Sequence, residues 1–138
     1  MTLLLVIGAG ILSAQEKPTL YERVGRYDGL ATIVDAYLKG VRSDPQFARF
    51  GGGRATESLV RAKQMFKDQL CAMTGGPCVY IGRDMKTAHG GLGITDSDWA
   101  ASMKYMAAAL DRSHVSGSEK EEFLAMIDSM KPMCVEKR

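Results

Sequence analysis

His89 is the residue of this sequence best suited to hold a metal ion. It lies ten residues before the single tryptophan, Trp99, and the chain has one other histidine, His114. A neutral imidazole is the commonest protein ligand for transition metals, so His89 is a candidate ligand. The alternative is a solvated loop histidine, which we expect for His114 because it falls in a polar break between two helices.

The chain around His89 is unusual for a small helical domain. Residues 75–95 contain six glycines and one proline, too many for a stable long helix. Connections in compact helical domains are normally a few residues long, and longer ones are usually functional or disordered. This stretch is too apolar for disorder, because it contains Tyr80, Ile81, Met85, Leu92 and Ile94. We expect it to pack against another group, and a flat apolar cofactor would suit it.

Length and composition indicate one globular domain. The 138 residues fit a single domain, and an apolar fraction of 46% is enough to bury a core. The net charge is +2, without a block of basic residues that would neutralise phosphates, which argues against nucleic acid as a partner.

Residues 1–14 are apolar and uncharged, but too short to span a bilayer as a helix, so no stable membrane span is expected. They resemble the hydrophobic part of a signal peptide, which predicts export to the periplasm and cleavage near Ala14. Two features are atypical: no Lys or Arg precedes the run, and Leu12 fits poorly at its place before the cut. If the true start of the chain lies elsewhere, the protein would instead be cytoplasmic.

The three cysteines leave two alternatives open. Cys71 and Cys78 are seven positions apart across a Thr-Gly-Gly-Pro turn that can bring them together. A disulfide between them is permissible in an exported protein, and otherwise they are free thiols packed as small apolar groups. Cys134 has no partner in either case. The sequence has no Cys-x-x-Cys motif, which argues against thioredoxin-type and zinc sites.

Apolar residues recur at helical spacing, and no alternating strand pattern is present. The predicted fold class is all-α, with one helical domain over residues 19–134. A short helix is expected from the capping box at Thr19 to Gly25. Four longer helices are expected between Asp28 and Asp44, from about Thr56 to Gly75, from Thr95 to Ser116, and after Ser118.

Five motifs follow one another along the chain: Leu20–Gly25, Asp44-Pro45 with Phe47 and Phe50, Gly75–Pro77, Tyr80–Lys86, and Ala88–Thr95. Over residues 19 to about 132 this order resembles the truncated haemoglobins of group I. The stretch from Gly-Gly-Pro to the histidine is its specific part. The resemblance implies a two-over-two helical sandwich around one haem b per chain. It also accounts for residues 75–93, which would wrap the haem edge.

His89 matches the proximal histidine of this family, so the resemblance implies that it is the metal ligand and holds the haem iron. Arg83 would pair with a haem propionate, unless it lies on a solvated positive face. The other residues expected to bind the cofactor are Phe50, Phe66, Tyr80, Met85, Leu92, Trp99 and Met103.

On the distal side the chain departs from the family, which usually has a Phe-Tyr pair late in the second helix. The pair here is Tyr37-Leu38, so the hydroxyl comes one position early. Tyr37 is expected to face inward, and its alternative is a core tyrosine bonded elsewhere. Ala62 and Phe66 match two positions that face the distal pocket, and both are apolar. Gln69 is the candidate distal hydrogen-bond donor, with a solvated glutamine as the alternative.

Three functions are compatible with the sequence, in this order. The first is reversible binding of a diatomic gas, O2, NO or CO, for oxygen binding or transport. The second is NO dioxygenation or peroxide reduction on the same haem. It would need an external reductase, because the sequence has no nicotinamide-binding fingerprint. The third is a haem-free, exported helical interaction module.

Overall fold

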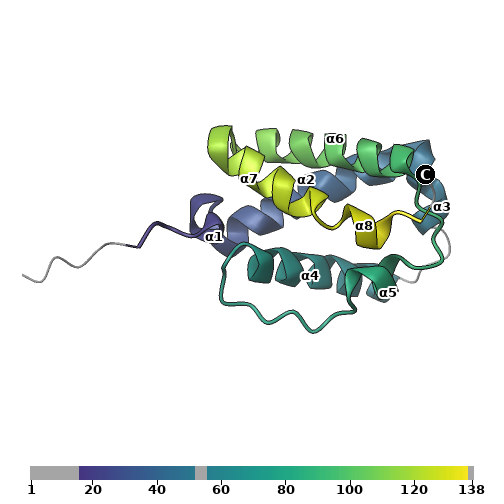
Figure 1. Cartoon of the computed structure of the whole chain (residues 1–138), viewed down its shortest axis with the longest axis horizontal. Coiled ribbons are helices and arrows are strands. Elements are labelled where there is room, and N and C mark those ends of the chain that lie inside the picture. Colours follow the sequence, from purple (N-terminus) through teal and green to yellow (C-terminus); the bar gives the residue numbers. More distant parts are fainter. Residues whose placement is uncertain (1–15, 52–55, 137–138) are drawn as a thin grey trace, which may run out of the picture.

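The computed structural model describes residues 16–51 and 56–136, and every regular element within these ranges is a helix (Figure 1). The all-α prediction is therefore confirmed. The predicted signal segment, residues 1–14, lies outside the described residues. Within the two described ranges, no helix combines the length and apolar character that a bilayer span requires.

Four long helices build the domain, and short elements connect them. The long ones are α2 (Arg26–Ser43), α4 (Thr56–Met73), α6 (Asp96–Arg112) and α7 (Gly117–Asp128). The short ones are α1 (Leu20–Arg23), the 3-10 turn η1 (Pro45–Phe47), α3 (Ala48–Gly51), α5 (Met85–His89) and α8 (Lys131–Cys134).

Side-chain caps begin two of these helices where the sequence predicts them. Thr19 precedes α1 and Thr95 precedes α6, each in a complete capping box. The second helix was expected to begin at Asp28, and this start is wrong, because α2 already begins at Arg26. The residue before it, Gly25, has φ of 92°, a left-handed conformation that glycine adopts without strain. Asp28 therefore lies in the first turn of α2, where a negative charge favours the helix dipole.

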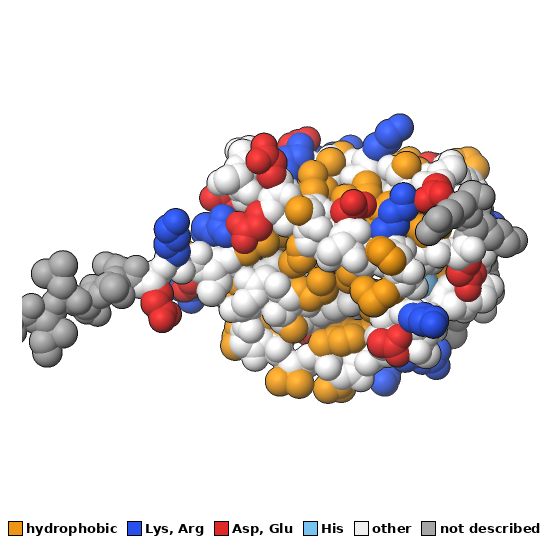
Figure 2. All heavy atoms as spheres, in the orientation of Figure 1, with side chains coloured by type: hydrophobic (Ala, Val, Ile, Leu, Met, Phe, Trp, Pro, Cys, Tyr) orange, Lys and Arg blue, Asp and Glu red, His pale blue; other side chains and the backbone are white. Residues whose placement is uncertain are grey.

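The long helices form two packed layers (Figure 1). α2 contacts both α4 and α6, and α7 packs beside α6. In Figure 2 apolar side chains gather along the middle of the visible face, between α7 and α8 on one side and α4 on the other. The residues buried almost completely in the core are Leu30, Ile33 and Val34 of α2, Leu70 of α4, Met106 and Leu110 of α6, and Phe123 of α7. Burial of each such side chain stabilises the fold by roughly 1.5–3 kcal/mol.

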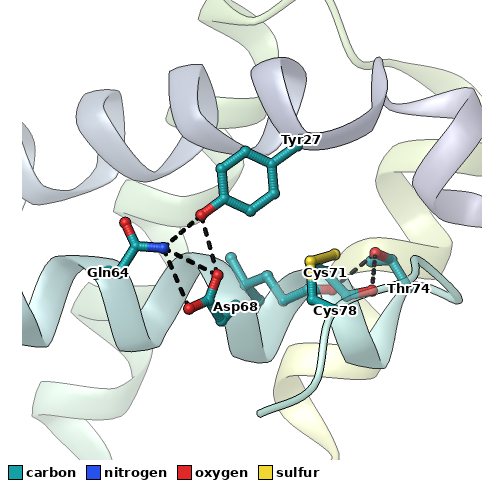
Figure 3. Close-up of a disulfide and its surroundings, with 7 residues drawn as sticks. Tyr27, Gln64, Asp68, Cys71, Thr74 and Cys78 are labelled. Atoms are coloured by element: carbon teal, nitrogen blue, oxygen red, sulfur yellow. Dashed lines mark hydrogen bonds between the residues drawn. A yellow bond between two sulfur atoms is a disulfide. The ribbon is translucent and has the colours of Figure 1, made fainter.

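A disulfide joins the end of α4 to the loop that leads to α5 (Figure 3). Cys71 and Cys78 are bonded, with their Cα atoms 5.7 Å apart. Of the two alternatives, a disulfide or two free thiols, the structure contains the disulfide. Beside it, the Tyr27 hydroxyl of α2 donates a hydrogen bond to Asp68 of α4 at 3.0 Å. The disulfide fixes the start of the loop against α4, and the hydrogen bond joins α4 to α2. Cys134 is a buried free thiol.

A buried carboxylate holds the start of α6 against η1 and α3. Asp98 accepts hydrogen bonds from Thr95, from the Gln46 amide at 2.9 Å and from the Arg49 guanidinium. Burial raises the pKa of this carboxyl, but the hydrogen bonds act in the opposite direction and together lower it below its ordinary value. The carboxylate therefore remains charged and paired at neutral pH.

Candidate haem site

His89 is the last residue of the five-residue helix α5 and is half-buried. Asp84 begins this helix, because its carboxylate accepts hydrogen bonds from the backbone N–H and the hydroxyl of Thr87 at 3.0 and 2.6 Å. The Nδ1 atom of His89 lies 2.9 Å from the Met85 carbonyl oxygen, so Nδ1–H is the donor of this bond. Metal-bound histidines usually make such a bond with their second nitrogen, since it fixes the tautomer and the ring orientation. Nε2 is therefore the nitrogen left for a metal.

An apolar pocket of about 440 Å³ lies where α2, α3 and α4 meet. Its volume is within the roughly 300–1,000 Å³ typical of ligand sites. The structure brings together four predicted residues in its wall: Leu38, Phe50, Ala62 and Phe66. The other apolar wall residues were not predicted for the site: Val41, Phe47, Ala48 and Leu59. All but Ala48 have an apolar neighbour three or four positions away, a signal that could have indicated them. Two cations, Arg42 and Lys63, also line the pocket.

The two polar residues predicted for the distal side do not line this pocket. The Tyr37 hydroxyl is hydrogen-bonded to the Ser102 hydroxyl of α6 at 2.7 Å, and its ring packs on Phe66 with 5.7 Å between centroids. Burial raises the pKa of the Tyr37 hydroxyl, so it stays protonated at neutral pH. The Gln69 side chain is buried, and its amide nitrogen donates to the Met85 sulfur at 3.0 Å.

The remaining residues predicted to bind the cofactor also lie outside this pocket, on α5, on α6 and in the loops before and after α5. Tyr80 donates its hydroxyl hydrogen to the Arg83 carbonyl oxygen at 2.6 Å, and the Arg83 side chain is exposed. The Trp99 indole N–H donates to Asp128 of α7 at 2.8 Å. Met85 is buried, whereas Leu92 and Met103 are half-buried. Their roles toward the cofactor remain predictions.

These residues suit haem in two respects. His89 offers a single imidazole nitrogen with its tautomer set by a backbone carbonyl, which is the usual proximal ligand of globins. The pocket on α2, α3 and α4 offers an apolar wall for a porphyrin and for a small uncharged gas. Within the described residues, an all-helical fold, an apolar pocket and a histidine with Nε2 free for a metal fit the globin class.

Comparison with known proteins agrees with this class. The family model described as bacterial-like globin matches residues 19–135, and the chain belongs to this family. It is 30% identical over 117 residues to the group 1 truncated hemoglobin of Mycolicibacterium paratuberculosis, covering 85% of this chain and 84% of that protein. It is 28% identical over 123 residues to the group 1 truncated hemoglobin of Tetrahymena thermophila, covering 89% and 99%.

Solved structures show the same fold. The Fe(III) form of truncated hemoglobin from Tetrahymena pyriformis superposes with a TM-score of 0.79 at 23% identity, covering 87% of this chain and 100% of that one. The group II truncated hemoglobin from Bacillus anthracis gives 0.78 at 21% identity, covering 89% and 95%. The predictions of a group I truncated haemoglobin and a two-over-two globin fold are thus confirmed. As a globin of this family the protein binds haem, with diatomic gases as its ligands, and a haem-free interaction module is not favoured.

Proposed function

We propose that His89 holds the haem iron through Nε2, and that the apolar pocket on α2, α3 and α4 receives O2 reversibly and releases it quickly. Haem, when bound, would supply the iron to which a diatomic gas binds. The observation that carries the proposal is the Nδ1 hydrogen bond to the Met85 carbonyl oxygen, which orients the ring and leaves Nε2 available.

We expect O2 to leave quickly because the polar side chains predicted for the distal side already have other hydrogen-bond partners. The Tyr37 hydroxyl is bonded to Ser102, and the Gln69 amide rests on the Met85 sulfur. The position where the family usually has a tyrosine is Leu38, which lines the pocket with carbon atoms.

O2 is retained by a hydrogen bond to its partly negative oxygen. Two donors, Arg42 and Lys63, do line the pocket, and Lys63 is paired with Asp35, so the proposal of fast release requires that Arg42 does not donate to the gas. A pocket that releases O2 quickly suits short-range transport of O2 better than its storage.

Visible absorption spectra of the purified, haem-loaded protein test this function. We expect a Soret band, a deoxy spectrum on reduction, and distinct spectra with O2 and CO that return to the deoxy form when the gas is removed. Absence of a Soret band after addition of haem would contradict the proposal. Repeated oxidation of NO or reduction of peroxide in the presence of an added reductant, faster than the free reaction of an exposed oxyhaem, would favour the enzymatic alternative. Each such turnover consumes electrons that a separate reductase must supply.

We also propose that the protein is exported. Two observations support this: residues 1–14 have the composition of a signal-peptide core, and the disulfide Cys71–Cys78 would persist only in an oxidising compartment. The variant Leu5→Arg, which places a charge in the apolar run, is expected to keep the chain uncut inside the cell. The wild type should be found outside the cytoplasm with its first residue near Gln15. Mass spectrometry of fractionated cells measures both, and uncut wild-type protein in the cytoplasm would contradict export.

A further inference from the structure

The C-terminal residues return to the turn that follows His89. Figure 1 shows α8 beside α5, and the two helices are in contact. We call residues 134–136, at the end of α8 and just after it, the C-terminal clamp. The Glu136 carboxylate accepts hydrogen bonds from the backbone N–H groups of Gly91 and Gly93, one on each oxygen and both 2.6 Å long. The backbone N–H of Glu136 donates to the Ile94 carbonyl oxygen at 2.9 Å.

The turn itself is shaped to receive a carboxylate. Gly91 has φ of 81° and Gly93 has φ of 64°, left-handed conformations that glycine adopts without strain. Turns with such conformations direct nearby N–H groups into one concavity that binds anions. Here the concavity is filled by a side chain of the same protein. Because Leu92 N–H also donates to the His89 carbonyl oxygen at 3.2 Å, this turn is bonded directly to the backbone of His89.

The second contact of the clamp reaches the imidazole. The Cys134 sulfur lies 3.6 Å from His89 Nδ1, the same nitrogen that is bonded to the Met85 carbonyl oxygen, and Cys134 is only 2% exposed. A buried sulfur in this place limits how far the ring can rotate about its bonds. The imidazole is therefore held from α5 by a carbonyl oxygen and from α8 by a thiol.

We propose that Cys134 and Glu136 are positioning residues for His89, which hold its ring and the following turn in the orientation needed to retain haem. This rests on the proposed role of His89 as the iron ligand. Glu136 acts on the backbone after the histidine, and Cys134 acts on the ring. Neither residue lines the pocket on α2, α3 and α4, so their effect is on the proximal side.

Four single variants of the full chain test the clamp. Glu136→Ala removes both hydrogen-bond acceptors, and Glu136→Gln keeps the side-chain length and one acceptor oxygen. Cys134→Ala removes the sulfur beside the ring. Met133→Ala is the matched control, since Met133 is on the same short helix but is 45% exposed.

Three readouts report on positioning. Transfer of haem to an excess of apomyoglobin should be about tenfold faster for Glu136→Ala than for wild type, as is typical when an outer partner of a metal ligand is removed, with Glu136→Gln in between. Hydrogen exchange of the Gly91 and Gly93 amides, measured by NMR on the reduced CO form, should also be faster by about tenfold or more in Glu136→Ala. Cys134→Ala should shift or broaden the iron–histidine band in the resonance Raman spectrum of the reduced protein, and Met133→Ala should change none of the three.

The outcomes separate this inference from the proposed function. If His89→Ala retains haem as well as wild type, the ligand assignment is wrong and the clamp proposal falls with it. If His89→Ala loses haem while Glu136→Ala and Cys134→Ala match Met133→Ala in all three readouts, the clamp alone is overturned. Faster haem transfer together with faster exchange confined to Gly91 and Gly93 supports it, because general loss of stability would speed exchange throughout the core.

Discussion

Replacement of His89 by alanine is expected to remove most of the protein's capacity to retain haem. Among the described residues the His89 imidazole is the proposed ligand of the iron, with Nδ1 bonded to the Met85 carbonyl oxygen and Nε2 available. Loss of a ligand should cost more than the roughly 10–100-fold in affinity that loss of an outer partner costs. The rate of haem transfer to apomyoglobin measures the effect. Far-UV circular dichroism should remain helical, because the side chain is only half-buried.

The second histidine provides a matched control. His114 is exposed and has φ of 59°, so His114→Asn removes an imidazole and keeps a residue that tolerates this conformation. This variant should retain haem like wild type. Added imidazole should restore a globin spectrum to His89→Ala by occupying the space the side chain leaves. A His89→Ala protein with unchanged haem transfer and unchanged spectra would show that another group ligates the iron.

The fold was predictable because its signals are local. The capping boxes at Thr19 and Thr95 each involve residues three positions apart. The helical spacing of apolar residues is likewise a local pattern, and Leu30 and Ile33 of α2, which follow it, are buried. The start of α2 was missed, since a left-handed Gly25 determines it and no side-chain cap is involved. The short elements α3, α5 and α8 span too few turns to produce a periodic pattern.

The site was predictable only in part, because its polar contacts join residues far apart in sequence. Helical phase indicates that Tyr37 faces inward, but Ser102, the hydrogen-bond partner of its hydroxyl, is 65 positions away in the sequence. Helical phase likewise placed Gln69 near the inward face, and it is buried there. The direction of its amide depends on the Met85 and Met130 sulfurs, which only the packed fold brings close. The contacts of the C-terminal clamp with His89 and the turn after it likewise join residues that are far apart in sequence.

Replacement of Leu38 by tyrosine is expected to slow the release of O2 by about tenfold, because a net hydrogen bond contributes up to about 1.5 kcal/mol. Leu38 lines the apolar pocket on α2, and the resemblance to the group I truncated haemoglobins implies a tyrosine at this position. A hydroxyl there would add a hydrogen-bond donor to a position that is apolar in the wild type. Stopped-flow displacement of O2 by CO measures the release rate. Release of CO should change much less, since CO is a poor hydrogen-bond acceptor.

Two further variants decide whether the hydroxyl is responsible. Leu38→Phe adds the same ring without the donor, so it should leave O2 release near the wild-type rate. Equal slowing by Leu38→Phe and Leu38→Tyr would mean that the ring blocks escape and that the apolar wall is not the cause of fast release. Tyr37→Phe removes the hydroxyl that is bonded to Ser102. This variant should not change the rate of O2 release. Faster release would identify Tyr37 as a hydrogen-bond donor to the gas, and would contradict the proposal that its hydroxyl is occupied by Ser102 of α6.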